Sequence, residues 1–152
     1  LKQTIEACYK EQRDRLHAPL QRHLKPFLND LFPSAELELA DGFSIAAIKR
    51  GSSAETFERL SAGTQEQIAV LVRLAMGSMI GERGQQVPII LDDALVFSDD
   101  DRIEQMFDAL HRAGQRQQVI VLTCRTRAFA AVGNCRSRPL RQHLPRRFQL
   151  QL

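Results

Sequence analysis

The sequence lacks any long apolar run, and it has few cysteines. Spanning a bilayer takes about 20 consecutive apolar residues, so no membrane segment is expected. The three cysteines, Cys8, Cys124 and Cys135, are odd in number, lie far apart and show no C-x-x-C spacing. This pattern argues against a disulfide framework and a structural zinc site, and it indicates a reduced intracellular setting, most simply the cytoplasm.

The first residues, LKQTIEACYKEQRD, contain neither an initiating methionine nor the apolar core of a signal peptide. We therefore expect the chain to be an excised part of a longer protein. Its 152 residues are enough to bury one hydrophobic core. The composition, 43% hydrophobic and 26% charged, is ordinary for a soluble globular domain.

Charge is distributed unevenly along the chain, although the net charge is only +3. Residues 1–60 contain nine basic and nine acidic residues, and residues 61–110 contain three basic and nine acidic ones. Residues 111–152 contain nine arginines and no acidic residue. The acidic centre suggests a place for a cation, and the basic tail suggests contact with a polyanion such as DNA. The alternative is that the two blocks face each other or an acidic partner lobe.

The first thirty residues have the apolar spacing of a helix. Pro19 and Pro26 fall inside this pattern and predict a break or a kink. The part between Ile5 and Leu16 is either the end of a longer coiled coil or an ordinary amphipathic helix packed on the domain. The stripe at steps of three and four consists of Ile5, Tyr9, Gln12, Leu16, Leu20, Leu24, Phe27 and Leu31.

Residues 36–48 change to the alternation of polar and apolar residues that is typical of strands. Asp41-Gly42 is a strong turn signal between two such runs, so the sequence predicts a β-hairpin. The polar, Ser-rich residues 49–59 predict a loop. A second amphipathic helix follows, with its apolar side between Ile68 and Ile80, and two glycines end it.

The remaining elements alternate between strand and helix. Residues 87–91 and 119–122 are short, wholly apolar runs that predict buried parallel strands. Residues 100–113 have helical spacing, and residues 148–152 alternate like a last strand. This order predicts an α/β fold: a parallel-sheet core with flanking helices and an added β-hairpin.

Three segments carry residues suited to chemistry. Leu60-Ser61-Ala62-Gly63-Thr64-Gln65-Glu66-Gln67 directly precedes the long second helix, where free backbone N–H groups and the helix dipole favour phosphate. The simpler alternative is that Ser61 or Thr64 is a plain N-cap, with Gln67 as the capping partner of Thr64. Further along, the strand Ile89-Ile90-Leu91 ends in Asp92-Asp93, at the sheet edge where α/β folds bind ligands. Two adjacent carboxylates repel each other unless a cation shares the site, and magnesium is the natural guest.

The strand at residues 119–122 ends in Thr123-Cys124-Arg125, which can reach the same edge. The order of these segments resembles the C-terminal half of an ABC-type ATPase head, a P-loop NTPase fold. Within that superfamily it is most similar to the SMC and RecF/RecN-like branch that acts in DNA maintenance, because a coiled-coil-like helix precedes the hairpin. The resemblance covers roughly residues 15–135. It divides the chain into a helical end of a coiled coil at 1–32 and a head lobe at 33–152.

The resemblance implies a role for each motif residue. Ser61 and Gly63 match the signature motif, with Gln67 beside them, and would contact the γ-phosphate of ATP held by the opposing head of a head-to-head homodimer. Asp92 matches the Walker B acid that supports Mg²⁺. Asp93 stands where the catalytic glutamate orients the attacking water. The last two matches are Asp99 with the D-loop aspartate and the Thr123–Arg125 segment with the switch.

The departures from the family pattern matter as much as the matches. Asp93 is one methylene shorter than glutamate, which predicts looser water positioning and slow turnover. No histidine follows Thr123, and Arg125 is a candidate to stabilise transition-state charge instead. No G-x-x-x-x-G-K-[S/T] loop occurs in the sequence, so the groups that cradle the β- and γ-phosphates are missing. In SMC-like proteins that loop lies on an N-terminal lobe across the coiled coil, so this chain alone should not hydrolyse ATP.

Three functions remain open from the sequence. The first is an ATPase head whose ATP-gated dimerisation is coupled to DNA maintenance or repair. The second is a degenerate, non-hydrolysing structural or DNA-binding module. The third, a metal-dependent nuclease built on Asp92 and Asp93, is disfavoured because no third well-placed acid and no Lys or His suited to act as a base are evident.

Overall fold

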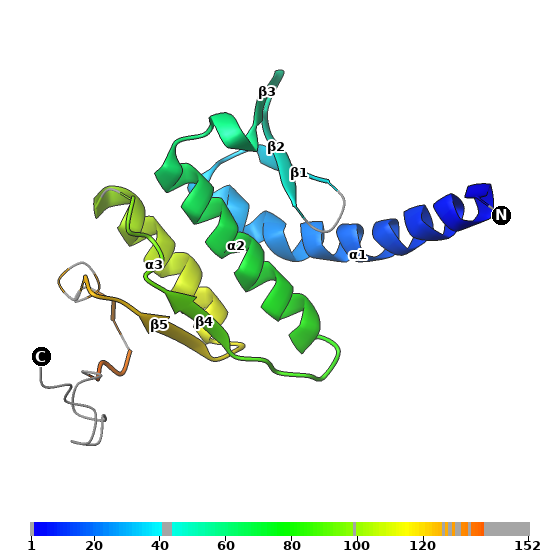
Figure 1. The fold of residues 1–152 in the computed structure, drawn as a ribbon. Helices are drawn as coiled ribbons and strands as arrows, with labels where there is room; N and C mark the ends of the chain where they lie inside the picture. Colours follow the sequence, from blue (N-terminus) through cyan, green and yellow to red (C-terminus); the bar gives the residue numbers. More distant parts are fainter. Residues whose placement is uncertain are drawn as a thin grey trace, which may run out of the picture.

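The structure is a computed structural model, and it describes residues 2–40, 44–98 and 100–125, with residues 127, 129, 132, 133 and 135–138. Figure 1 shows the sheet β1-β2-β3 at one end of the molecule and the pair β4-β5 at the other, with α2 and α3 between them. The expected mixed fold with a small parallel sheet is confirmed. The elements are α1 (Lys2–Leu31), β1 (Ala35–Leu39), β2 (Ile45–Arg50), β3 (Ser53–Thr56), the 3-10 turn η2 (Phe57–Arg59), α2 (Ala62–Gly81), β4 (Ile89–Asp92), α3 (Asp100–Gly114) and β5 (Val119–Leu122).

The first helix, α1, is continuous over 30 residues, although Pro19 and Pro26 lie inside it. Of the predicted break or kink, the break is therefore wrong, and the ribbon curves instead of running straight (Figure 1). Each proline removes one helical hydrogen bond, but tertiary packing outweighs that loss. Leu20 and Leu24 are 0% and 2% exposed on the half of α1 that packs against α2. The N-terminal half extends away from the domain (Figure 1), and Ile5 there is 54% exposed.

The antiparallel sheet confirms the predicted hairpin and extends it. β1 pairs with β2 in a register that places Leu37 opposite Ile48, while the turn signal Asp41-Gly42 lies outside the described residues. The predicted loop at residues 49–59 is wrong in part, because β2 continues to Arg50 and pairs there with β3. Gly51 adopts φ +59°, the left-handed conformation that a two-residue hairpin connection requires. Every residue of β3 is exposed, which suits its polar sequence.

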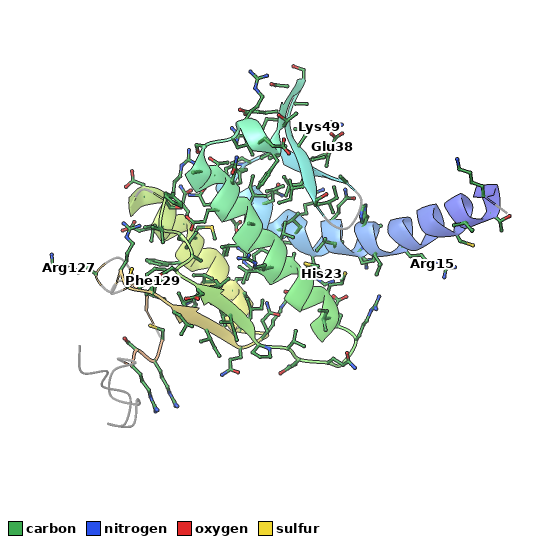
Figure 2. The ribbon with its side chains drawn as sticks, in the orientation of Figure 1. Arg15, His23, Glu38, Lys49, Arg127 and Phe129 are labelled. Carbon is green, nitrogen blue, oxygen red and sulfur yellow. The ribbon has the colours of Figure 1, made fainter. Side chains whose placement is uncertain are left out.

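A surface ion pair joins the two longer strands of this sheet. The side chains of Glu38 on β1 and Lys49 on β2 lie together in Figure 2 and form a salt bridge. The hydrogen bond and the negative charge of Glu38 raise the pKa of Lys49 above its ordinary value of 10.5. A raised lysine pKa adds stability below pH 10.5 that is lost as the pH rises through the folded-state pKa. Because both side chains are about half exposed, the pair contributes little.

Over the residues that the structure describes, helices cover only one face of the parallel pair β4-β5. Asp92 lies opposite Leu122 at the carboxyl end of the register, and Ile90 lies opposite Ile120. Leu91 points into the core beneath α2 and α3 and is 1% exposed. On the other face Ile90 is 59% exposed and Ile120 is 36% exposed, which corrects the expectation of wholly buried strands. Among the described residues, no helix has the length and apolar character needed to cross a membrane.

Candidate functional site

The signature-like segment forms the capped start of α2. Ser61 is the N-cap, and its Oγ accepts a 3.3 Å hydrogen bond from the Thr64 N–H and lies 2.9 Å from Thr64 Oγ1. The Gln65 N–H donates to the Ser61 carbonyl at 2.9 Å. Within the described part of the chain, the N–H groups of Ala62 and Gly63 have no hydrogen-bond partner. The exposed end of α2 therefore presents two unpaired donors and a serine hydroxyl, the groups that a helix start offers to an anion.

The segment that precedes α2 is held in place by the side chain of Gln65. Its Nε2 donates to the Phe57 carbonyl at 2.9 Å and to the Leu60 carbonyl at 3.0 Å. These bonds join the 3-10 turn η2 to the first turn of α2. No local pattern predicted this role, because glutamine is an ordinary helix-forming residue.

The two acidic residues lie at the carboxyl end of β4, as predicted. Asp92 is the last residue of the strand, and its exposed side-chain carboxylate has no hydrogen-bond or ion-pair partner among the described residues. The Asp93 N–H donates to the Leu122 carbonyl at 2.8 Å, and Asp93 Oδ1 accepts a 3.0 Å hydrogen bond from the Cys124 N–H. The tips of β4 and β5 are thus joined, and the second carboxylate is oriented by the backbone after β5.

The segment after β5 reaches across to the loop after β4 through Arg125. Its Nη1 donates to the Val96 carbonyl at 2.8 Å and to the Leu95 carbonyl at 3.2 Å, while its own N–H donates to Thr123 Oγ1 at 3.0 Å. The sequence suggested a guanidinium that meets transition-state charge. In the structure the group is held on two backbone carbonyls, so it has a positioning task that the sequence did not reveal.

The loop of residues 93–98 is docked onto the first two turns of α2. A Cβ added at Gly63 would lie 2.7 Å from the Phe97 carbonyl oxygen, so only glycine fits this approach. Glu66 accepts hydrogen bonds from the N–H groups of Val96 at 3.1 Å and Phe97 at 3.0 Å. Gly63 therefore allows α2 and the loop to pack closely, and its suggested phosphate contact stays a prediction. Glu66 was missed by the sequence reasoning.

Gln67, suggested from the sequence as a nucleotide contact, lies inside the protein. Its side chain is 0% exposed, and its Nε2 donates to Ser98 Oγ at 3.0 Å. A contact with nucleotide would require this buried bond to break, so we assign Gln67 to the packing between α2 and the loop. It is not the capping partner of Thr64 either, because the Thr64 N–H donates to Ser61 Oγ at 3.3 Å and Gln67 Oε1 has no hydrogen-bond partner among the described residues.

The side chains at the end of β4 can be compared with the ligands that a divalent cation prefers. In the described part of the chain, no group of three or more His, Cys, Asp or Glu side chains gathers as a closed metal site. An exposed, unpaired Asp92 fits Mg²⁺ nonetheless, because this ion is usually held by one or two carboxylates together with water and substrate phosphates. Asp99, the expected D-loop residue, lies outside the described residues, and α3 begins directly after it at Asp100.

Comparison with known proteins adds distant relatives. No family model matches the chain. Uncharacterized proteins of Mycobacterium bovis (strain ATCC BAA-935 / AF2122/97) and Mycobacterium tuberculosis (strain ATCC 25618 / H37Rv) are each 31% identical to it over 119 residues. These alignments cover 73% of this chain but only 14% of the relatives. The chain therefore spans a small part of the length of these proteins.

Solved structures identify the fold. A structure from work on ATP-driven dimerization and DNA-stimulated activation of SMC ATPases matches with a TM-score of 0.61 and 22% identity, covering 80% of this chain and 76% of that one. The SMC head domain from Thermotoga maritima matches with a TM-score of 0.59 and 19% identity, over 81% of this chain and 44% of that one. An SMC head bound to the C-winged helix domain of ScpA matches with a TM-score of 0.60 and 21% identity, over 80% of this chain and 40% of that one. The chain has the fold of an SMC-like ATPase head.

Proposed function

We propose that this chain forms the C-terminal half of an SMC-like ATPase head and contributes the signature and Walker B motifs to a composite ATP site. One observation carries the proposal. The loop that follows the exposed carboxylates of β4 is docked, through Gly63 and Glu66, on the same helix whose capped start has two unpaired N–H groups. This loop thus connects the exposed carboxylates after β4, which suit a cation, with a helix start that suits an anion.

Each motif residue then has a chemical task in ATP hydrolysis. Ser61 and the free N–H groups of Ala62 and Gly63 would bind the γ-phosphate of a nucleotide on the opposing head of a homodimer. Asp92 would hold Mg²⁺ at the end of β4, and the ion, when bound with the phosphates, supplies neutralisation of their charge. Asp93 would orient the attacking water through its carboxylate, which the Cys124 N–H keeps in place.

The open face of β4-β5 supports a partner lobe. Ile90 and Ile120 are exposed on adjacent strands, whereas strands of a parallel sheet are ordinarily covered on both faces. We propose that the N-terminal P-loop lobe of the same protein covers this face and supplies the missing phosphate-binding loop. Burying two isoleucines would help to join the lobes into one head.

DNA is the proposed polyanion. Residues 111–152 contain nine arginines and no acidic residue, a composition that favours electrostatic contact with a phosphate backbone. A neighbour in fold comes from work on DNA-stimulated activation of SMC ATPases, which agrees with this assignment. A function in DNA maintenance or repair follows from that proposal.

ATP turnover by the complete protein, intact and with Asp93→Asn, tests the function. Asp108→Asn on the exposed side of α3 is the matched control, because it removes the same charge away from the sheet edge. We expect Asp93→Asn to lower turnover by about 10²–10⁴-fold, the usual contribution of a positioned acid or base, and Asp108→Asn to leave it unchanged. ATP binding without turnover by the intact protein would favour the non-hydrolysing structural module. Equal turnover by Asp93→Asn would contradict the assigned role.

A further inference from the structure

The loop of residues 93–98 is strained at two positions. Asp93 has φ +43° and Leu95 has φ +68°, and neither residue is a glycine. Side chains with a Cβ are disfavoured in this left-handed region, so such a conformation persists only where surrounding contacts hold it. The contacts that hold this loop therefore decide where the Asp93 carboxylate lies.

Those contacts come from two sides. From α2, the two carboxylate oxygens of Glu66 accept the Val96 and Phe97 N–H groups at 3.1 and 3.0 Å. From the segment after β5, Arg125 donates to the carbonyls of Leu95 and Val96. Val96 is thus held at its N–H by Glu66 and at its carbonyl by Arg125. All four bonds involve a charged group, and such bonds are roughly twice as strong as neutral ones.

We propose that Glu66 is a positioning residue that couples the signature end of α2 to Asp93 within one head. The inference rests on the proposed function and adds a residue that the motif resemblance does not supply. Because Glu66 lies one turn beyond Gly63 on α2, a shift of the helix start carries the loop with it or breaks both bonds. Nucleotide contact at the signature of a head would thereby change the position of the water-orienting carboxylate at that head's own site.

The experiment uses the complete protein with Glu66→Gln, Arg125→Gln and both changes together. Glutamine keeps the size of Glu66, but its NH2 group replaces one of the two acceptor oxygens and cannot accept a backbone N–H. We expect each single variant to lower kcat by about tenfold and to leave ATP affinity nearly unchanged. Loss of a hydrogen bond to a charged group costs enough free energy for a change of about tenfold or more. The double variant should fall little further, because both residues hold the same two peptide units, those on either side of Val96. Glu58→Gln, an equal charge change in η2, is the matched control.

Amide hydrogen exchange gives a second measurement that does not depend on activity. In Glu66→Gln the Val96 and Phe97 amides should exchange faster, while the Leu91 amide of β4 stays as slow as in the wild type. The coupling is overturned if Glu66→Gln matches Glu58→Gln in kcat while Asp93→Asn is inactive, or if the two single effects simply multiply. Equal turnover by wild type and Asp93→Asn overturns instead the proposed function on which the coupling rests.

Discussion

Replacing Gly63 by alanine tests the close contact between α2 and the loop after β4. The new Cβ would lie 2.7 Å from the Phe97 carbonyl oxygen, whereas ordinary contacts begin at 3.4 Å, so the loop backbone must move by about 0.7 Å. Overpacking of this kind costs about 1–3 kcal/mol, and alanine returns up to about 1 kcal/mol of helix propensity. With the full propensity gain, the net loss is up to about 2 kcal/mol, measured as a lower urea midpoint at unchanged m-value.

Gly81→Ala in the same helix is the matched control. A Cβ at Gly81 would meet no atom within 4 Å, so only the propensity gain of up to about 1 kcal/mol remains, less at a helix end. The two substitutions should therefore shift the urea midpoint in opposite directions. A Gly63→Ala variant as stable as Gly81→Ala, with unchanged hydrogen exchange at Phe97, would refute the close approach and the docking built on it.

The remaining predictions concern the core, the tail and the carboxylate. Leu24→Ala, at a buried position of α1, should cost about 2–5 kcal/mol in urea unfolding, and Ile5→Ala on the projecting half should stay within about 0.5 kcal/mol. Equal losses of stability in the two variants would contradict the division of α1 into a packed half and a projecting half. Binding of duplex DNA through residues 111–152 should weaken steeply between low and high salt, and salt-independent binding would exclude it. Cys124→Ser should leave turnover unchanged, because the backbone N–H holds Asp93; a large loss would show that the thiol itself acts.

Elements with a clear period were predictable from the sequence. The apolar spacing between Ile68 and Ile80 marked α2, and the β4 and β5 runs were found because their branched residues stand between polar boundaries. Sequence order also predicted that Asp93 and Thr123 follow adjacent strands, since parallel strands carry their ends to one edge. Local patterns were enough to predict an element wherever the spacing of its own apolar residues determines its secondary structure.

The errors arose where tertiary contacts or a single backbone angle decided. Pro19 predicts a break in isolation, but burial of the residues next to it keeps α1 continuous. Gly51 gave the Ser-rich segment a tight turn and a third strand, which composition alone did not indicate. Glu66 bonds to residues about thirty positions away, so no local motif could assign its role. Gln67 was predicted to contact nucleotide because it follows the signature-like segment, yet its position on α2 places its side chain inside the protein.

The most direct test of a composite site mixes two inactive heads. In complete protein, Ser61→Arg should block the signature surface and Asp93→Asn should disable the carboxylate, so each variant alone should show almost no ATP turnover. If each site joins the Asp93 of one head to the Ser61 of the other, a mixed dimer regains one intact site. An equal mixture should then recover up to about a quarter of wild-type turnover, because half of the dimers are mixed and each carries one intact site. A mixture no more active than its components would contradict the composite site.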